Sequence, residues 1–129
     1  MKYIAALLLA LSTGYLFAAE SPKRQTMEVD GKTFPVFRCP IEVSPSRQTS
    51  PVYPKSAARD GRGGEVLVGA LVDAKGEVTK AFVVKAAADA DIQEAARSSV
   101  AQWRFPRKKE ASGPMSYVVL VPVIMRADR

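Results

Sequence analysis

The sequence predicts an α+β domain in which a small three-stranded antiparallel sheet carries two helices on one face, with a β-hairpin on its N-terminal side. Three patterns support this prediction. Two alternating apolar runs flank a turn within 64–87, an apolar stripe of helical period covers 92–103, and a β-prone run extends from about 115 to 126. A short helix before the first run completes the order helix, strand, strand, helix, strand. One sheet covered by both helices is the simplest solution for this order.

The chain begins with the pattern of a secretory signal peptide. Lys2 precedes an apolar run that ends with Phe17 and is followed by two small residues, Ala18 and Ala19. As a helix this run would extend roughly 22 Å, which is shorter than the ~30 Å hydrocarbon core of a bilayer. We therefore expect residues 1–19 to be cleaved as a signal peptide and the mature chain to be exported. Contact with the membrane is expected only if this segment is retained as an anchor.

Residues 20–49 are predicted to form a hairpin followed by a proline-rich linker. Asp30 and Gly31 lie between short β-prone flanks in 27–37, which is typical of a type I′ hairpin turn. A two-stranded hairpin is only marginally stable alone, so it must pack on another part of the chain. The segment CPIEVSPSRQTSP that follows has the composition of an extended linker.

Each later element has its own signal. Pro54 suits the first turn of a short helix that ends at Gly61. The two alternating runs are joined by DAKG, in which Gly76 suits the left-handed position of a hairpin turn. The second helix is indicated by an apolar stripe at spacings of three and four residues, made of Ile92, Ala95, Ala96, Ser99, Val100 and Trp103. These elements place the folded domain at 50–129.

The residue types argue against catalysis and against a metal site. The chain has no histidine and one cysteine, so histidine-based catalytic sites, thiolate or imidazole zinc sites and a CxxC pair are excluded. We expect no enzyme activity, no metal and no cofactor. The net charge of +6 suits an acidic partner, an anionic surface or nucleic acid, and export argues against nucleic acid. Cys39 is expected to be a partly buried thiol, with an intermolecular disulfide as the alternative.

Pro122 lies in the middle of the last β-prone run, where a strand with neighbours on both sides would lose a hydrogen bond. This predicts that the last strand is an edge strand with the proline nitrogen directed outward. Alternation then directs the backbone groups of Val118, Leu120 and Ile124 outward as well. Unpaired edges accept extended peptides as extra strands, and the proline limits the usable stretch to 116–121. The alternative is that Pro122 only protects the edge against aggregation.

The motifs of residues 50–126 together resemble the C-terminal domain of TonB-type energy transducers, to which the C-terminal domain of TolA is related. The resemblance rests on a YP pair before a short helix, G-x-V in the first strand, VD-x-x-G-x-V at the hairpin, a helix ending in WRF, and V-P-V in the last strand. The residues at these positions include Tyr53, Pro54, Gly64, Asp73, Gly76, Trp103, Arg104, Phe105 and Pro122.

This resemblance implies a periplasmic domain of a Gram-negative bacterium that takes part in energy-coupled transport. It would bind a peptide of an outer-membrane TonB-dependent transporter, or another envelope protein, as a strand beside its own last strand. The implied partner-binding residues come from the segment before YP and from the last strand: Ser50, Pro51, Val52, Ser116, Tyr117, Val118, Val119, Leu120 and Val121.

Two alternatives stay open at this point. In the first, the edge pairs with the same edge of a second copy, which would make the chain a homodimer or a structural envelope module without energy transduction. In the second, the hairpin at 27–37 already occupies the edge, so that binding requires its displacement.

Overall fold

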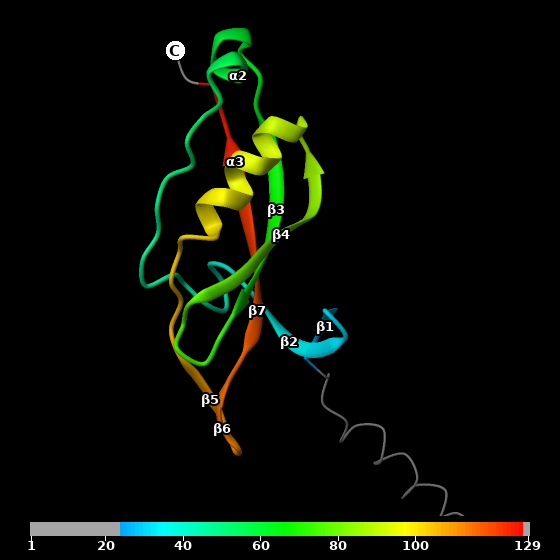
Figure 1. Ribbon diagram of the computed structural model, residues 1–129, viewed down its shortest axis with the longest axis vertical. Coiled ribbons are helices and arrows are strands. Elements are labelled where there is room, and N and C mark those ends of the chain that lie inside the picture. The colour runs from blue at the N-terminus through cyan, green and yellow to red at the C-terminus, as the bar shows by residue number, and fades with distance from the viewer. Residues whose placement is uncertain (1–23, 128–129) are drawn as a thin grey trace, which may run out of the picture.

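The computed structural model describes residues 24–127 and shows an elongated α+β domain (Figure 1). Its main sheet has five strands in the order β1-β2-β7-β3-β4. These strands are β1 (Thr26–Val29), β2 (Lys32–Arg38), β3 (Gly64–Val72), β4 (Val78–Ala87) and β7 (Tyr117–Met125). The other elements are the helices α2 (Lys55–Asp60) and α3 (Ala90–Val100) and a two-stranded sheet of β5 (Lys108–Glu110) and β6 (Gly113–Met115).

The predicted three-stranded antiparallel sheet is wrong in its strand number. Strands β3, β4 and β7 form that antiparallel unit, but the N-terminal hairpin extends it, because β2 pairs with β7 in parallel. The hairpin itself is confirmed: β1 and β2 are antiparallel, and both Asp30 (φ 52°) and Gly31 (φ 81°) have the positive φ of a type I′ turn.

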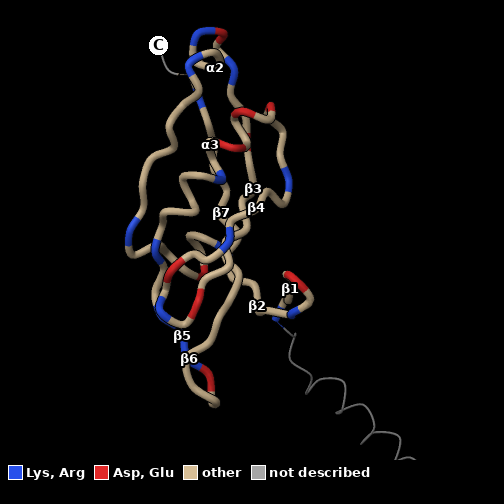
Figure 2. Tube along the Cα trace, in the orientation of Figure 1, with Lys and Arg blue, Asp and Glu red and all other residues tan. Residues whose placement is uncertain are grey.

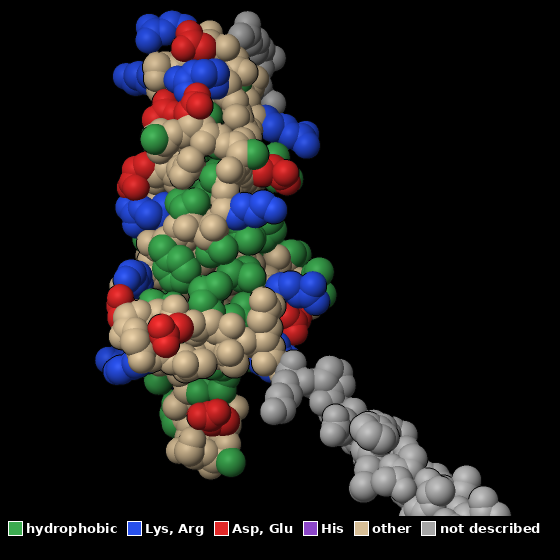
Figure 3. All heavy atoms as spheres, turned by 90° about the vertical axis from the view of Figure 1, so that its right-hand side faces the viewer, with side chains coloured by type: hydrophobic (Ala, Val, Ile, Leu, Met, Phe, Trp, Pro, Cys, Tyr) green, Lys and Arg blue, Asp and Glu red, His purple; other side chains and the backbone are tan. Residues whose placement is uncertain are grey.

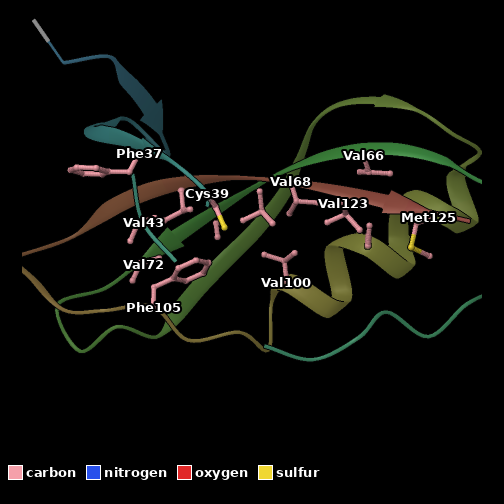
Figure 4. Packing of buried hydrophobic residues seen from close by; sticks show 14 of the residues in the cluster. Phe37, Cys39, Val43, Val66, Val68, Val72, Val100, Phe105, Val123 and Met125 are labelled. Atoms are coloured by element: carbon pink, nitrogen blue, oxygen red, sulfur yellow. The ribbon is translucent and has the colours of Figure 1, made fainter. Parts of the chain in front are cut away.

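Alternation along β3 and β7 directs one set of side chains toward the helices, and these form the inner core. Figure 4 shows this core with Phe37 near one end, Val68 in the middle and Met125 near the other end. The buried members include Val66, Val68, Ala70 and Val72 from β3, Ile92, Ala96 and Val100 from α3, and Tyr117, Val119, Val121, Val123 and Met125 from β7. Full burial of one aliphatic side chain contributes about 1.5–3 kcal/mol, so most of the stability resides here.

A second, smaller cluster lies on the opposite face of the sheet, and we call it the outer cluster. It consists of buried Val29, Val36 and Val118, with partly buried Met27, Phe34, Leu71, Phe82 and Leu120 around them. The hairpin contributes its side chains from one side and the strands β3, β4 and β7 from the other. Sequence alternation predicted a sheet with one covered face, whereas the hairpin covers part of the second face.

The second helix ends at Val100 and not at Trp103 as the apolar stripe predicted. Tight turns follow, in which the N–H of Trp103 donates to the carbonyl oxygen of Val100 at 3.0 Å. Trp103 still packs against the inner core, and its Nε1 donates to the carbonyl oxygen of Thr49 at 2.9 Å. The loop expected at 106–114 contains the β5–β6 hairpin.

The proline-rich segment is not a free linker. Val43 is 7% exposed and belongs to the inner core. The N–H of Ser46 donates to the carbonyl oxygen of Arg104, and the N–H of Arg104 donates to that of Arg47. Ser99 Oγ on α3 donates to the carbonyl oxygen of Thr49 at 2.7 Å. These hydrogen bonds hold the connecting segment (residues 43–54) along the helical side of the domain.

Among residues 24–127, no helix is both long enough and apolar enough to cross a membrane. The predicted signal peptide, residues 1–19, lies outside the described residues.

Candidate strand-binding site at β7

The last strand, β7, lies between two neighbours. It pairs with β3 in antiparallel register along its whole length, from Gly64↔Met125 to Val72↔Tyr117. On its other side β2 runs parallel to it, in the register Val36↔Val118, Phe37↔Val119 and Arg38↔Leu120. The prediction that the last strand is an edge strand is therefore wrong over 118–120. There β2 already occupies the edge, as in the alternative in which the hairpin at 27–37 covers it.

The predicted orientation of the β7 backbone is confirmed. The N–H of Cys39 donates to the carbonyl oxygen of Leu120 at 3.0 Å, so the backbone groups of Leu120 face away from β3. Pro122 has the same orientation by alternation, and it lies two residues beyond the last position that β2 covers. The missing N–H of Pro122 therefore costs no hydrogen bond to β3.

Two side chains of β2 fill opposite faces of this site. Val36, 2% exposed, packs in the outer cluster beside Val118. Phe37 belongs to the inner core and meets Tyr117 edge-on, with ring centroids 5.4 Å apart and an interplanar angle of 83°. Aromatic pairs in this geometry contribute about 0.5–1.5 kcal/mol beyond their buried area. The site thus has one apolar wall on each face of the sheet.

Two cations flank the ring of Phe37. Arg24 Cζ lies 4.1 Å from its centroid and Lys108 Nζ lies 4.3 Å from it. A cation over an aromatic face is attracted by the ring quadrupole, which favours an aromatic side chain at this position. Sequence reasoning missed Val36 and Phe37 as site residues. The predicted hairpin could have indicated them, because a two-stranded hairpin is only marginally stable and must pack on another part of the domain.

Two exposed ion pairs lie around the hairpin and add to its apolar contacts. Lys80 Nζ lies 2.9 Å from Asp30 Oδ1 and links the hairpin turn to β4. Arg24 and Glu42 form a second pair at 3.0 Å, and the hydrogen bond from Arg24 lowers the pKa of the Glu42 carboxyl. Exposed pairs of this kind contribute little to stability. Apolar contacts therefore provide most of the attachment.

Burial changes the acidity of two groups at the site. Tyr117 is 0% exposed, and desolvation raises its pKa to about 12. Its hydroxyl donates a hydrogen bond to the carbonyl oxygen of Pro106. Cys39, 9% exposed, is buried as a free thiol, and burial raises its pKa. Both groups are uncharged at neutral pH and act as parts of the apolar packing.

The two predicted sets of partner-binding residues lie at different places. Ser116, Tyr117, Val118, Val119, Leu120 and Val121 are at the β7 site, where Tyr117, Val118, Val119 and Val121 are buried. Ser50 and Val52 instead line a groove of about 440 Å³ against α3, together with Glu94 and Ser98, and Pro51 connects them. Val52 is 83% exposed there.

The motif residues brace the two ends of the sheet. At the end near β5, Asp73 Oδ1 accepts the N–H groups of Lys75 and Glu77 at 2.9 Å, which fixes the turn between β3 and β4. Gly76 of this turn has φ 87° and accepts the N–H of Phe105 at 2.9 Å. Arg104 forms isolated bridges with both Arg47 and Glu77. These motif residues support the fold around the site and do not line it.

At the other end, Tyr53 fixes the entry into β3, whose first residue is Gly64, while Pro54 is the N-cap of α2. The hydroxyl of Tyr53 donates to the carbonyl oxygen of Arg62, which precedes β3. The Arg62 guanidinium pairs with Asp89 and Asp91 at the start of α3, and its hydrogen bond lowers the pKa of the Asp91 carboxyl. Figure 2 shows acidic and basic residues interspersed along the described chain. The basic balance therefore arises from scattered charges.

Beyond the hairpin, the outer face of the sheet is exposed. Ile124 is 56% exposed and Val84 41%. A shallow groove of about 250 Å³ lies nearby, with Leu67, Lys85 and Pro122 among its lining residues. Figure 3, which views the molecule from the side of the hairpin, shows hydrophobic side chains gathered at mid-height.

Together these features define a small α+β domain whose last strand is paired on its outer side with a parallel strand of the same chain, β2, between two apolar walls. The profile of the family described as "Gram-negative bacterial TonB protein C-terminal" matches residues 49–124, which is more than half of the chain. The chain belongs to this family. The sequence resemblance to TonB-type domains is thereby confirmed.

Individual relatives agree with this assignment. The chain is 35% identical over 65 residues to proteins named "Protein TonB" from two strains of Xanthomonas campestris pv. campestris, B100 and ATCC 33913. The match covers 50% of this chain but only 29% of each relative. In fold, the chain is similar to the solution structure of the Pseudomonas aeruginosa TonB C-terminal domain, with a TM-score of 0.55 and 22% identity over 67% of this chain and 88% of that one.

Proposed function

We propose that this chain is a protein-binding domain of the bacterial cell envelope that engages its partner by β-strand addition to β7, in energy-coupled transport. Its role would be non-catalytic recognition of main-chain groups. Membership of the TonB C-terminal family supports the class of protein. The chain matches less than a third of the length of its TonB relatives, so its part in energy transduction is proposed in addition to its family membership.

One observation carries the proposal: β2 already lies on β7 as an added parallel strand at 118–120. The edge of β7 is therefore geometrically able to accept an extended segment. The backbone groups of Val118 and Leu120 would bind the partner, while the buried side chains of Tyr117, Val119 and Val121 hold the strand in place. Ser50, Pro51 and Val52 would provide a second contact beside α3.

The expected affinity follows from the number of hydrogen bonds. An added strand that forms four or five main-chain hydrogen bonds gains about 1 kcal/mol net from each, less the cost of ordering the peptide. With apolar contacts on both faces, this corresponds to a dissociation constant on the order of micromolar. Such an affinity suits a partner that must be bound and released repeatedly.

The proposed partner is the N-terminal segment of an outer-membrane TonB-dependent transporter, or another envelope protein with a free extended segment. The proposed location is the periplasm, with residues 1–19 as the export signal and inner-membrane anchoring as the less favoured outcome. The homodimer alternative needs the same release of β2 from residues 118–120 as peptide binding does. A monomer whose mass in ultracentrifugation is independent of concentration would count against it.

The test is titration of the mature chain with a synthetic peptide from the N-terminal segment of a TonB-dependent transporter of the same organism. Leu120→Pro removes an N–H that faces away from β3, so it should weaken binding at least tenfold while the domain stays folded. Ile124→Pro is the matched control, because its N–H has the same orientation outside the stretch that β2 covers. Unchanged affinity in folded Leu120→Pro would remove this edge as the binding site.

A further inference from the structure

The hairpin of β1 and β2 is packed as a separable unit. Its buried side chains Val29 and Val36 lie in the outer cluster, on the opposite face of the sheet from α3. Only Phe37, at the end of β2, belongs to the inner core. The hairpin pairs with the rest of the sheet at three positions of β7, whereas β3 pairs with β7 at nine.

Release of this hairpin would leave the rest of the sheet paired. Strands β3, β4 and β7 keep their own register, and α3 remains packed on the inner core. The ion pair of the turn is exposed, with Lys80 and Asp30 side chains 45% and 69% accessible. The hairpin has three buried apolar residues, Val29, Val36 and Phe37, against six in β7. An element with less buried apolar surface opens locally at a smaller free-energy cost than the whole domain.

We infer that β2 is a built-in occupant of the β7 edge and that its segment Val36-Phe37-Arg38 defines the kind of partner this edge accepts. The inference rests on the proposed function and adds its regulation and its specificity. A partner strand must run parallel to β7 and displace the hairpin. Its affinity is then reduced by the fraction of molecules in which the edge is free.

The first requirement on the partner is a branched apolar residue facing the outer cluster. When β2 leaves, Val118 loses the cover of Val36, and Leu71 and Phe82 lose that of the hairpin. A partner residue of similar shape in register with Val118 restores this burial. A charged residue there would lie against an apolar wall without a partner, which is costly.

The second requirement is an aromatic residue at the next position. The ring of Phe37 meets Tyr117 edge-on, and Lys108 Nζ lies 4.3 Å from its centroid. Both Tyr117 and Lys108 stay behind when the hairpin leaves, whereas Arg24 lies just before β1 and belongs to the departing side. The third position, that of Arg38, is exposed and accepts a polar residue.

A labelled peptide with the sequence of residues 32–38, KTFPVFR, serves as the probe, and its binding to the full chain is followed by fluorescence anisotropy. In the variant Val36→Asp the hairpin should detach, so that the peptide occupies the edge in its place. We expect the variant to bind KTFPVFR at least about tenfold more tightly than the wild-type chain. A peptide with alanine in place of the second phenylalanine should bind the variant at least tenfold more weakly.

Val84→Asp is the matched control, since it makes the same change at a 41% exposed position of β4, away from the hairpin. It should bind the peptide as the wild type does. Equal affinity of Val36→Asp and wild type, or equal affinity of the two peptides, would overturn the inference. If circular dichroism shows that Val36→Asp does not fold, Val29→Asp takes its place. If neither variant folds, the hairpin is not a separable unit and the inference is wrong.

The same variants separate this inference from the proposed function. If a transporter peptide binds wild type and Val36→Asp equally well, the hairpin does not compete and the inference fails while the function stands. If Val36→Asp binds KTFPVFR but neither form binds transporter peptides, strand exchange stands and the transporter as partner is wrong.

Discussion

Phe105 contacts Gly76 through both of its backbone polar groups, the N–H and the carbonyl oxygen. The N–H of Phe105 donates to the carbonyl oxygen of Gly76 at 2.9 Å, and the carbonyl oxygen of Phe105 occupies the space where a Cβ on Gly76 would lie. The turn between β3 and β4 is thereby fixed to the segment that follows α3. This contact gives a structural reason for a glycine at position 76.

Gly76→Ala should therefore destabilise the domain more than its backbone conformation alone requires. A non-glycine residue at φ 87° costs roughly 1–2 kcal/mol, and the overlap with Phe105 adds about 1–3 kcal/mol. Gly31→Ala is the control, because φ is 81° there and nothing lies within 4 Å of the added Cβ. Urea unfolding followed by circular dichroism measures both, and equal losses would show that the contact with Phe105 has no effect.

Gly69→Ala should be destabilising for a different reason. A Cβ at this position of β3 would overlap the ring of Phe82 on β4, which packs in the outer cluster. We expect a loss of about 1–3 kcal/mol in the free energy of unfolding. The double variant with Phe82→Ala should lose less than the sum of the two single variants, because the clash is absent. Additive losses in this double-mutant cycle would contradict the steric explanation.

Tyr117 should make the domain sensitive to high pH. Burial raises the pKa of Tyr117 to about 12, above the value of about 10 in the unfolded chain. The contribution of Tyr117 to the free energy of unfolding is fully present below pH 10. It decreases as the pH rises from 10 to 12, because the unfolded state loses the phenolic proton first. The free energy of unfolding should then fall with a slope that approaches about 1.4 kcal/mol per pH unit. Tyr117→Phe should lack this extra slope when unfolding is compared at pH 9 and pH 11.

The Cys39 thiol should react slowly with alkylating reagents. It is 9% exposed and burial raises its pKa, so little thiolate is present near pH 8. Iodoacetamide labelling followed by mass spectrometry should be at least tenfold slower in the native chain than in urea. Labelling at the same rate in both conditions would show that the end of β2 is open in solution.

The periodic elements could be predicted from the sequence because their signals are local. The alternation of Val66, Val68, Ala70 and Val72 identified β3, and Gly76 identified the turn to β4. The end of α3 could not be predicted this way. Trp103 continues the apolar stripe, yet it reaches the core from the turns after Val100, so period alone placed the helix end too late.

The candidate site could be predicted in part. Pro122 correctly indicated which backbone groups of β7 face away from β3, and the hydrogen bond from Cys39 to Leu120 agrees with it. The neighbour on that side could not be predicted, because parallel pairing of Val36 with Val118 joins residues that are far apart in the sequence. No turn or spacing specifies such a non-local pair, and the proline was equally consistent with an open edge.

The outermost strand on the far side of the sheet, β4, bears on colloidal behaviour at high concentration. Its register with β3 shifts opposite Leu67/Val68 and again opposite Leu71/Val72, so β4 carries two bulges. It also presents two lysines, Lys80 and Lys85. An edge strand with bulges and lysines is a poor template for pairing with another strand, so copies crowded into a narrow compartment would not stack into filaments through β4. The shape of β4 would in this way keep copies of the chain dispersed at concentrations where a flat, regular edge strand would join them.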